Sequence, residues 1–82
     1  MEILEREKDF IKIKVEDIDV LPALVKELNE DENVSFASFA IEHPLEDNKI
    51  LVVRTKKGKP ETAIKKAIKS LEKKLKDLES SL

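Results

Sequence analysis

Residues 10–16 alternate between apolar and charged side chains, reading Phe-Ile-Lys-Ile-Lys-Val-Glu. In an extended chain, successive side chains point to opposite faces, so the aliphatic residues share one face and the lysines the other. This pattern predicts a half-buried strand. Residues 2–7 are predicted to pair with it as a hairpin, with Lys8 and Asp9 at the turn.

Residues 20–30 change to a helical period. We expect Asp19 to cap this helix and Pro22 to lie in its first turn, where the missing N–H of proline is tolerated. The apolar residues recur at intervals of three and four, which predicts one face of an amphipathic helix: Leu21, Leu24, Val25 and Leu28.

Residues 34–41 and 49–55 predict two further strands. The first places Phe36 and Phe39 on opposite faces. Residues 50–53 are apolar without alternation, so we expect both faces of the second strand to be at least partly covered.

Residues 57–60 break the pattern again and include the one glycine of the chain. Pro60 then opens a helix over 61–82 that contains no helix breaker. The resulting order, β-β-α-β-β-α, predicts a two-layer α+β domain. Its sheet has four mostly antiparallel strands, both helices cover one face, and residues 1–82 form a single domain.

The apolar residues of the last helix follow steps of four and three, a heptad seam: Ile64, Ile68, Leu71, Leu75, Leu78 and Leu82. A helix of this length spans about 33 Å, whereas strands of six residues span roughly 20 Å. The last two turns therefore extend beyond the sheet. We expect their leucines to contact a folded partner; a frayed, solvent-exposed helix end is the alternative.

The net charge of −2 hides an asymmetry, because residues 1–48 carry −9 and residues 49–82 carry +7. Halves of opposite sign indicate self-complementarity or two different partners, although a solvated lysine-rich surface also explains them. The basic side of the last helix suits nucleic acid in charge but has no interleaved aromatic residue for base stacking: Lys65, Lys66, Lys69, Lys73 and Lys76.

Candidate chemistry is sparse. The chain has no cysteine, one histidine and one glycine, which excludes a thiolate metal site, a multi-histidine cluster and a glycine-rich phosphate loop. We expect no cofactor, no metal and no catalytic residue. No apolar run approaches the roughly 20 residues that cross a bilayer, and acidic residues interrupt the N-terminal stretch, unlike a signal peptide. These features predict a cytoplasmic protein without membrane contact.

Three segments resemble archaeal DNA-directed RNA polymerase subunit L. Residues 36–45, Phe-Ala-Ser-Phe-Ala-Ile-Glu-His-Pro-Leu, are similar to the family phrase Phe-Ala-Ser-Tyr-x-Ile-Glu-His-Pro-Leu. Residues 54–67 contain Arg-Thr-Lys followed by Gly, Pro and two Ala at the spacing of a second phrase, and residues 21–25 occupy the first-helix motif. The chain departs from that motif because Asp19 and Val20 replace His-Thr and Ala23 replaces Asn.

The resemblance implies a non-catalytic assembly subunit of RNA polymerase. It would form a heterodimer with the D-type subunit of the polymerase, and the pair would be the platform for the two large catalytic subunits. His43, Pro44 and Leu45 would form a loop that docks on a large subunit. The expected interface consists of apolar residues of both helices, with the later leucines foremost: Leu21, Leu24, Val25, Leu28, Ile64, Ile68, Leu71, Leu75 and Leu78.

Two other functions stay open. The same helices can pair with a second copy about a two-fold axis, which makes the isolated chain a homodimeric interaction module. Alternatively, the lysines of the last helix bind nucleic acid, in which case binding weakens steeply as salt rises.

Overall fold

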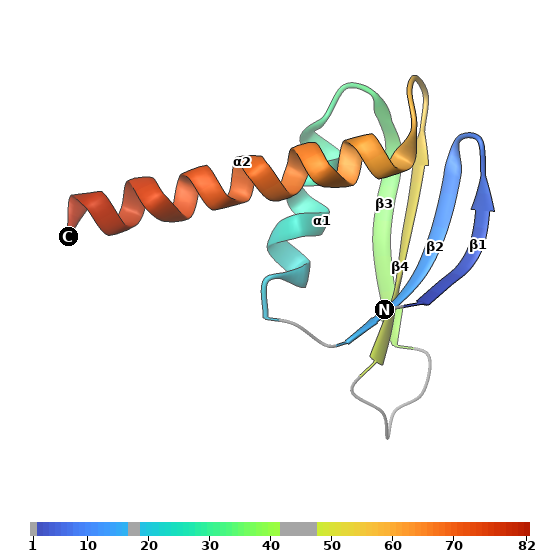
Figure 1. Cartoon of the computed structure of the whole chain (residues 1–82), viewed down its shortest axis with the longest axis horizontal. Helices are drawn as coiled ribbons and strands as arrows, with labels where there is room; N and C mark the ends of the chain where they lie inside the picture. The colour runs from blue at the N-terminus through green and yellow to red at the C-terminus, as the bar shows by residue number, and fades with distance from the viewer. Residues whose placement is uncertain (1, 17–18, 42–47) are drawn as a thin grey trace.

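Six elements make up the chain in a computed structural model that describes residues 2–16, 19–41 and 48–82. Their order confirms the predicted β-β-α-β-β-α arrangement, with bounds that agree to within one residue (Figure 1). His43, Pro44 and Leu45, which are predicted to form a docking loop, lie outside the described residues. The elements are β1 (Glu2–Glu7), β2 (Phe10–Glu16), α1 (Leu21–Glu30), β3 (Val34–Ile41), β4 (Asn48–Thr55) and α2 (Pro60–Ser81).

The strands form one sheet in the order β1-β2-β4-β3, and every neighbouring pair is antiparallel. On β4, Leu51 and Val53 belong to the core cluster under the helices. Ile50 and Val52 point to the opposite face by the alternation of a strand, yet Ile50 is also buried and Val52 is half-buried. Both faces of β4 are therefore partly covered, as its unbroken apolar sequence predicts.

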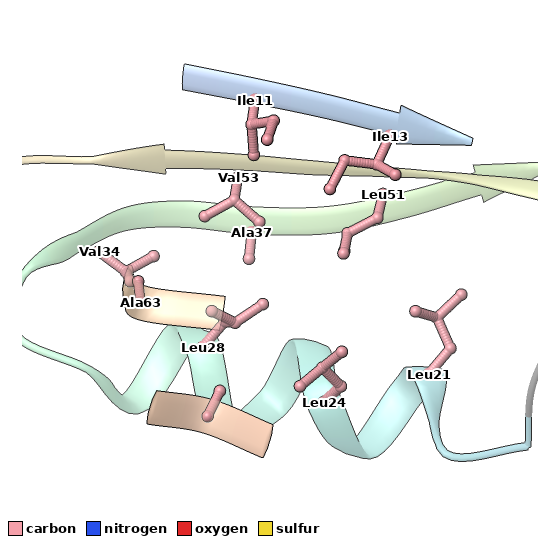
Figure 2. Packing of buried hydrophobic residues seen from close by; sticks show 11 residues of the cluster. Ile11, Ile13, Leu21, Leu24, Leu28, Val34, Ala37, Leu51, Val53 and Ala63 are labelled. Atoms are coloured by element: carbon pink, nitrogen blue, oxygen red, sulfur yellow. The ribbon is translucent and has the colours of Figure 1, made fainter. Parts of the chain in front are cut away.

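One hydrophobic core joins the sheet to both helices, so both helices cover the same face. In Figure 2 the side chains of β2, β3 and β4 point toward those of α1, and Leu28 and Val53 are fully enclosed. This arrangement confirms the two-layer α+β fold. No helix in the described part of the chain is long and apolar enough to cross a membrane.

The start of α1 differs from the prediction. Val20, not Asp19, occupies the cap position, and no side chain caps the helix. The backbone of Val20 already has helical angles, and its carbonyl accepts a hydrogen bond from the Leu24 N–H at 2.8 Å. Asp19 therefore lies one residue too early to receive the free N–H groups of the first turn. Pro22 is in the first turn, as predicted.

Asn29 anchors α1 to the edge of the sheet. Its side-chain amide donates to the carbonyl of Ala37 at 2.9 Å and accepts from the Ala37 N–H at 2.8 Å. Because β3 is an edge strand, these backbone groups have no neighbouring strand, and the amide takes the place of a peptide group. These two hydrogen bonds set the position of α1 along β3.

The turn before α2 requires its glycine. Gly58 has φ of +79°, in the left-handed region that other residues adopt at a cost. Its carbonyl accepts a hydrogen bond of 2.8 Å from the buried hydroxyl of Thr55, which closes the turn. The turn positions Pro60 at the start of α2, against the core.

Candidate partner interface

The buried residues of α2 are small and do not belong to the leucine seam. They are Pro60, Ala63 and Ala67, and Ser70 continues the same side of the helix toward α1. At 100° per residue, this side lies about 90° around the helix from the seam of large apolar residues. Short side chains allow α1 and α2 to approach closely. Most of the leucine seam then lies to one side of the contact between the two helices.

The nine predicted interface residues therefore divide into three groups. Leu21, Leu24 and Leu28 are buried in the core of the chain itself, so Leu21 and Leu28 move from the predicted interface to the core. Val25 and Ile64 are half-buried against that core. The remaining four are the outer part of the seam and are exposed or half-exposed: Ile68, Leu71, Leu75 and Leu78.

The first half of α1 and the projecting half of α2 diverge from their crossing (Figure 1). Residues of both helices line an apolar groove. Its volume is about 290 Å³. Leu24 forms its base beside the core, whereas Val20 and Leu75 are 43% and 52% exposed. The lining residues are Val20, Leu24, Ile68, Leu71, Glu72 and Leu75.

The second half of α2 is exposed and extends past the groove. All residues from 72 to 81 are exposed, a length of about 15 Å or nearly three turns, and Glu72 and Leu75 of this stretch also line the groove. α2 leaves the sheet because it crosses α1 instead of lying along the strands (Figure 1). Leu78 is 59% exposed and Leu82, just past the helix, is 99% exposed.

On the side of the helix crossing away from the groove, polar and charged side chains connect α1 to α2. The Glu27 carboxylate accepts hydrogen bonds from the Ser70 hydroxyl at 3.2 Å and from the Lys74 ammonium. Asp31, at the end of α1, forms an ion pair with Lys66 at 3.8 Å. The Lys74 ammonium lowers the pKa of Glu27 below its ordinary value of 4.5, and the same hydrogen bond raises the pKa of Lys74.

We expect Glu27→Gln to lower the melting temperature modestly at neutral pH, because a carboxylate–ammonium bond becomes a neutral one. The folded-state pKa of Glu27 is depressed, so its stabilisation is complete above pH 4.5 and is lost as the pH falls through the lowered pKa. The difference between wild type and variant should therefore shrink in acid. Thermal melts from pH 7 to pH 3 test this, with the exposed Glu32→Gln as control; a pH-independent difference contradicts it.

Sequence reasoning did not identify Val20, Glu72 or the Glu27 cluster. Val20 could have been found, since it precedes Leu24 by four residues and extends one edge of the α1 stripe. Glu72 is adjacent to Leu71 and thus borders the seam. The pairing of Glu27 with Lys74 joins residues 47 apart in the chain, and no local pattern indicates it.

Comparison with known proteins agrees with this architecture. Residues 10–81 match the family model described as the RNA polymerase Rpb3/Rpb11 dimerisation domain. DNA-directed RNA polymerase subunit Rpo11 of Thermoplasma acidophilum is 38% identical over 80 residues, which cover 95% of this chain and 72% of that protein. Rpo11 of Pyrobaculum aerophilum is 30% identical over 81 residues, covering 96% and 88%.

A solved structure extends the similarity to three dimensions. The crystal structure of DNA-directed RNA polymerase subunit L from Thermoplasma acidophilum matches with a TM-score of 0.86 and 36% identity, over 98% of this chain and 81% of that one. Sequence and fold thus confirm the resemblance seen in the three sequence segments. The chain belongs to the RNA polymerase Rpb3/Rpb11 dimerisation-domain family, among the archaeal subunit L proteins.

Proposed function

We propose that this chain is a non-catalytic assembly subunit of an archaeal DNA-directed RNA polymerase in the cytoplasm. It pairs through its helices with the D-type subunit, and the pair is the platform on which the large catalytic subunits assemble. The family description names a dimerisation domain, and the relatives are named as RNA polymerase subunits. Both descriptions support a role in pairing with another polymerase subunit.

The observation that carries the proposal is the uncovered apolar surface of α2 and the groove beside it. Leu75, Leu78 and Leu82 each expose more than half of their surface, and they follow one another along the same seam. Burying one such side chain contributes about 1.5–3 kcal/mol. A contiguous apolar surface of this kind is typical of a site for a protein partner.

In the proposed pair, the groove and the projecting seam contact helices of the D-type subunit. Ile68, Leu71, Leu75 and Leu78 supply the contact, and Leu24 supports it from the core. Val25 and Ile64 contribute their exposed edges. The loop of His43, Pro44 and Leu45 docks on a large subunit, a role carried over from the resemblance of residues 36–45.

Co-purification with the D-type subunit of the same genome tests the proposal. We expect a stable one-to-one complex by size-exclusion chromatography with light scattering, because apolar burial dominates the interface. The complex should persist at 0.5 M salt. Absence of a complex at micromolar concentrations of both subunits contradicts the proposed role.

Nucleic-acid binding is the second candidate, and one observation favours it. Lys65, Lys66, Lys69, Lys73 and Lys76 are all exposed, and most lie on the side of α2 away from the crossing with α1. Binding through these lysines should weaken steeply between 50 and 200 mM salt. Fluorescence anisotropy with a labelled duplex across that range separates the two functions.

A further inference from the structure

Glu72 is the one charged side chain among the residues that line the apolar groove. It lies midway between Ile68 and Leu75 on α2 and is exposed. Lys69 and Lys76 are each about one helical turn away. Within residues 2–16, 19–41 and 48–82, however, Glu72 forms no ion pair. Its carboxylate is thus available to a group outside the chain.

The position of Glu72 beside the heptad seam makes it sensitive to the identity of the partner. Ile68 and Leu75 hold equivalent seam positions one heptad apart, and Glu72 flanks them. Charged residues at such flanking positions select partner and orientation in paired helices, whereas the seam residues supply most of the affinity. The apolar residues of the groove suit the apolar face of a helix, and the charge of Glu72 beside them would discriminate between helices.

Self-pairing brings this carboxylate against its own copy. In a two-fold dimer, residues near the axis face the same residues of the second copy. An axis through the groove, with the two α2 helices antiparallel, places Glu72 of one copy opposite Glu72 of the other. The surrounding apolar side chains remove water from both carboxylates, so their repulsion is stronger than on an open surface.

We propose that Glu72 determines partner choice at the groove. It disfavours a second copy of this chain and selects a partner helix that presents a lysine or arginine opposite it. The inference rests on the proposed function, because it assumes that the groove is where the partner binds. The identity of the partner is then set by one carboxylate at the rim of an otherwise apolar site.

Self-association of the pure chain is the first test. Glu72→Gln keeps the shape of the side chain and removes the charge. We expect sedimentation equilibrium to show self-association at least tenfold tighter for this variant than for wild type. Asp77→Asn is the control, since it removes an exposed charge from α2 outside the groove. Equal self-association of wild type and Glu72→Gln overturns the inference.

Binding to the D-type subunit is the second test. Glu72→Lys places an ammonium group opposite the lysine or arginine that we propose on the partner helix. We expect the affinity for the D-type subunit to fall at least tenfold at 50 mM salt. The loss should diminish at 0.5 M salt, where the repulsion is screened. Far-UV circular dichroism should match wild type because Glu72 is exposed. An unchanged affinity at low salt overturns the inference.

The two proposals fail in distinguishable ways. If Leu75→Lys abolishes the complex while Glu72→Lys binds as well as wild type, the groove is the interface and the role of Glu72 is wrong. If Leu75→Lys binds as well as wild type, the interface lies elsewhere and both the pairing surface and the role of Glu72 are wrong. Loss of binding in both variants, with salt rescuing Glu72→Lys alone, supports both proposals.

Discussion

Leu75→Lys is expected to abolish pairing with the D-type subunit and to leave the monomer folded. Leu75 is 52% exposed and lines the groove, so the folded chain does not depend on it. In the complex, the variant loses the burial of a leucine and must desolvate an ammonium group. We expect a weakening of about 100-fold or more, equivalent to roughly 2.7 kcal/mol, measurable by isothermal titration calorimetry.

A second lysine variant controls for added charge. Ser80 is also exposed on α2, but it lies on the side away from the seam, so Ser80→Lys should bind as wild type does. Far-UV circular dichroism of the free variants separates the two roles that Leu75 can have. If Leu75→Lys loses helical signal, Leu75 belongs to the core of the monomer. If the variant still pairs with the D-type subunit, Leu75 does not belong to the interface.

Of the substitutions proposed for this protein, Leu28→Ala is expected to lower the free energy of unfolding the most. Leu28 is fully enclosed between α1 and the sheet (Figure 2). Truncating such a residue removes its burial and leaves a cavity, which costs about 2–5 kcal/mol. A domain of this size has a total stability near the lower end of about 5–15 kcal/mol. We expect the melting temperature to fall by roughly 15 °C.

The matched control is Leu82→Ala, the same substitution at a side chain that is 99% exposed. It should change the stability by less than about 0.5 kcal/mol. Urea denaturation of the two variants gives the comparison. Similar midpoints for both would mean that Leu28 is not enclosed as described, and that the division between core and interface residues is wrong.

The contrast between these leucines shows what periodicity can predict. The helical stripe over residues 21–28 and the seam over 64–82 each define residues that share a face, and the structure keeps both sets together. The spacing of apolar residues does not show which part of the protein, if any, packs against the face that they form. Leu28 and Leu75 belong to equally regular patterns, but the sheet covers the first, whereas the second is 52% exposed at the groove.

The sequence by itself determined the local elements and the family. Alternation over residues 10–16, the helical period of α1 and the Gly58–Pro60 break are local properties of the chain, so they set six elements whose bounds agree with the structure to within one residue. The segments over residues 21–25, 36–45 and 54–67 together indicate archaeal subunit L, and the comparisons confirm that family.

Only the tertiary structure decided which face of α2 meets α1. The hydrophobic pattern marks the leucine seam as the more favourable face to bury, but the buried residues of α2 include Ala63 and Ala67, whose small side chains permit a close crossing of the helices. That crossing carries α2 away from the sheet, opens the groove and brings Glu27 to Lys74. Periodicity describes one helix, whereas the angle between two helices depends on side chains distant in sequence.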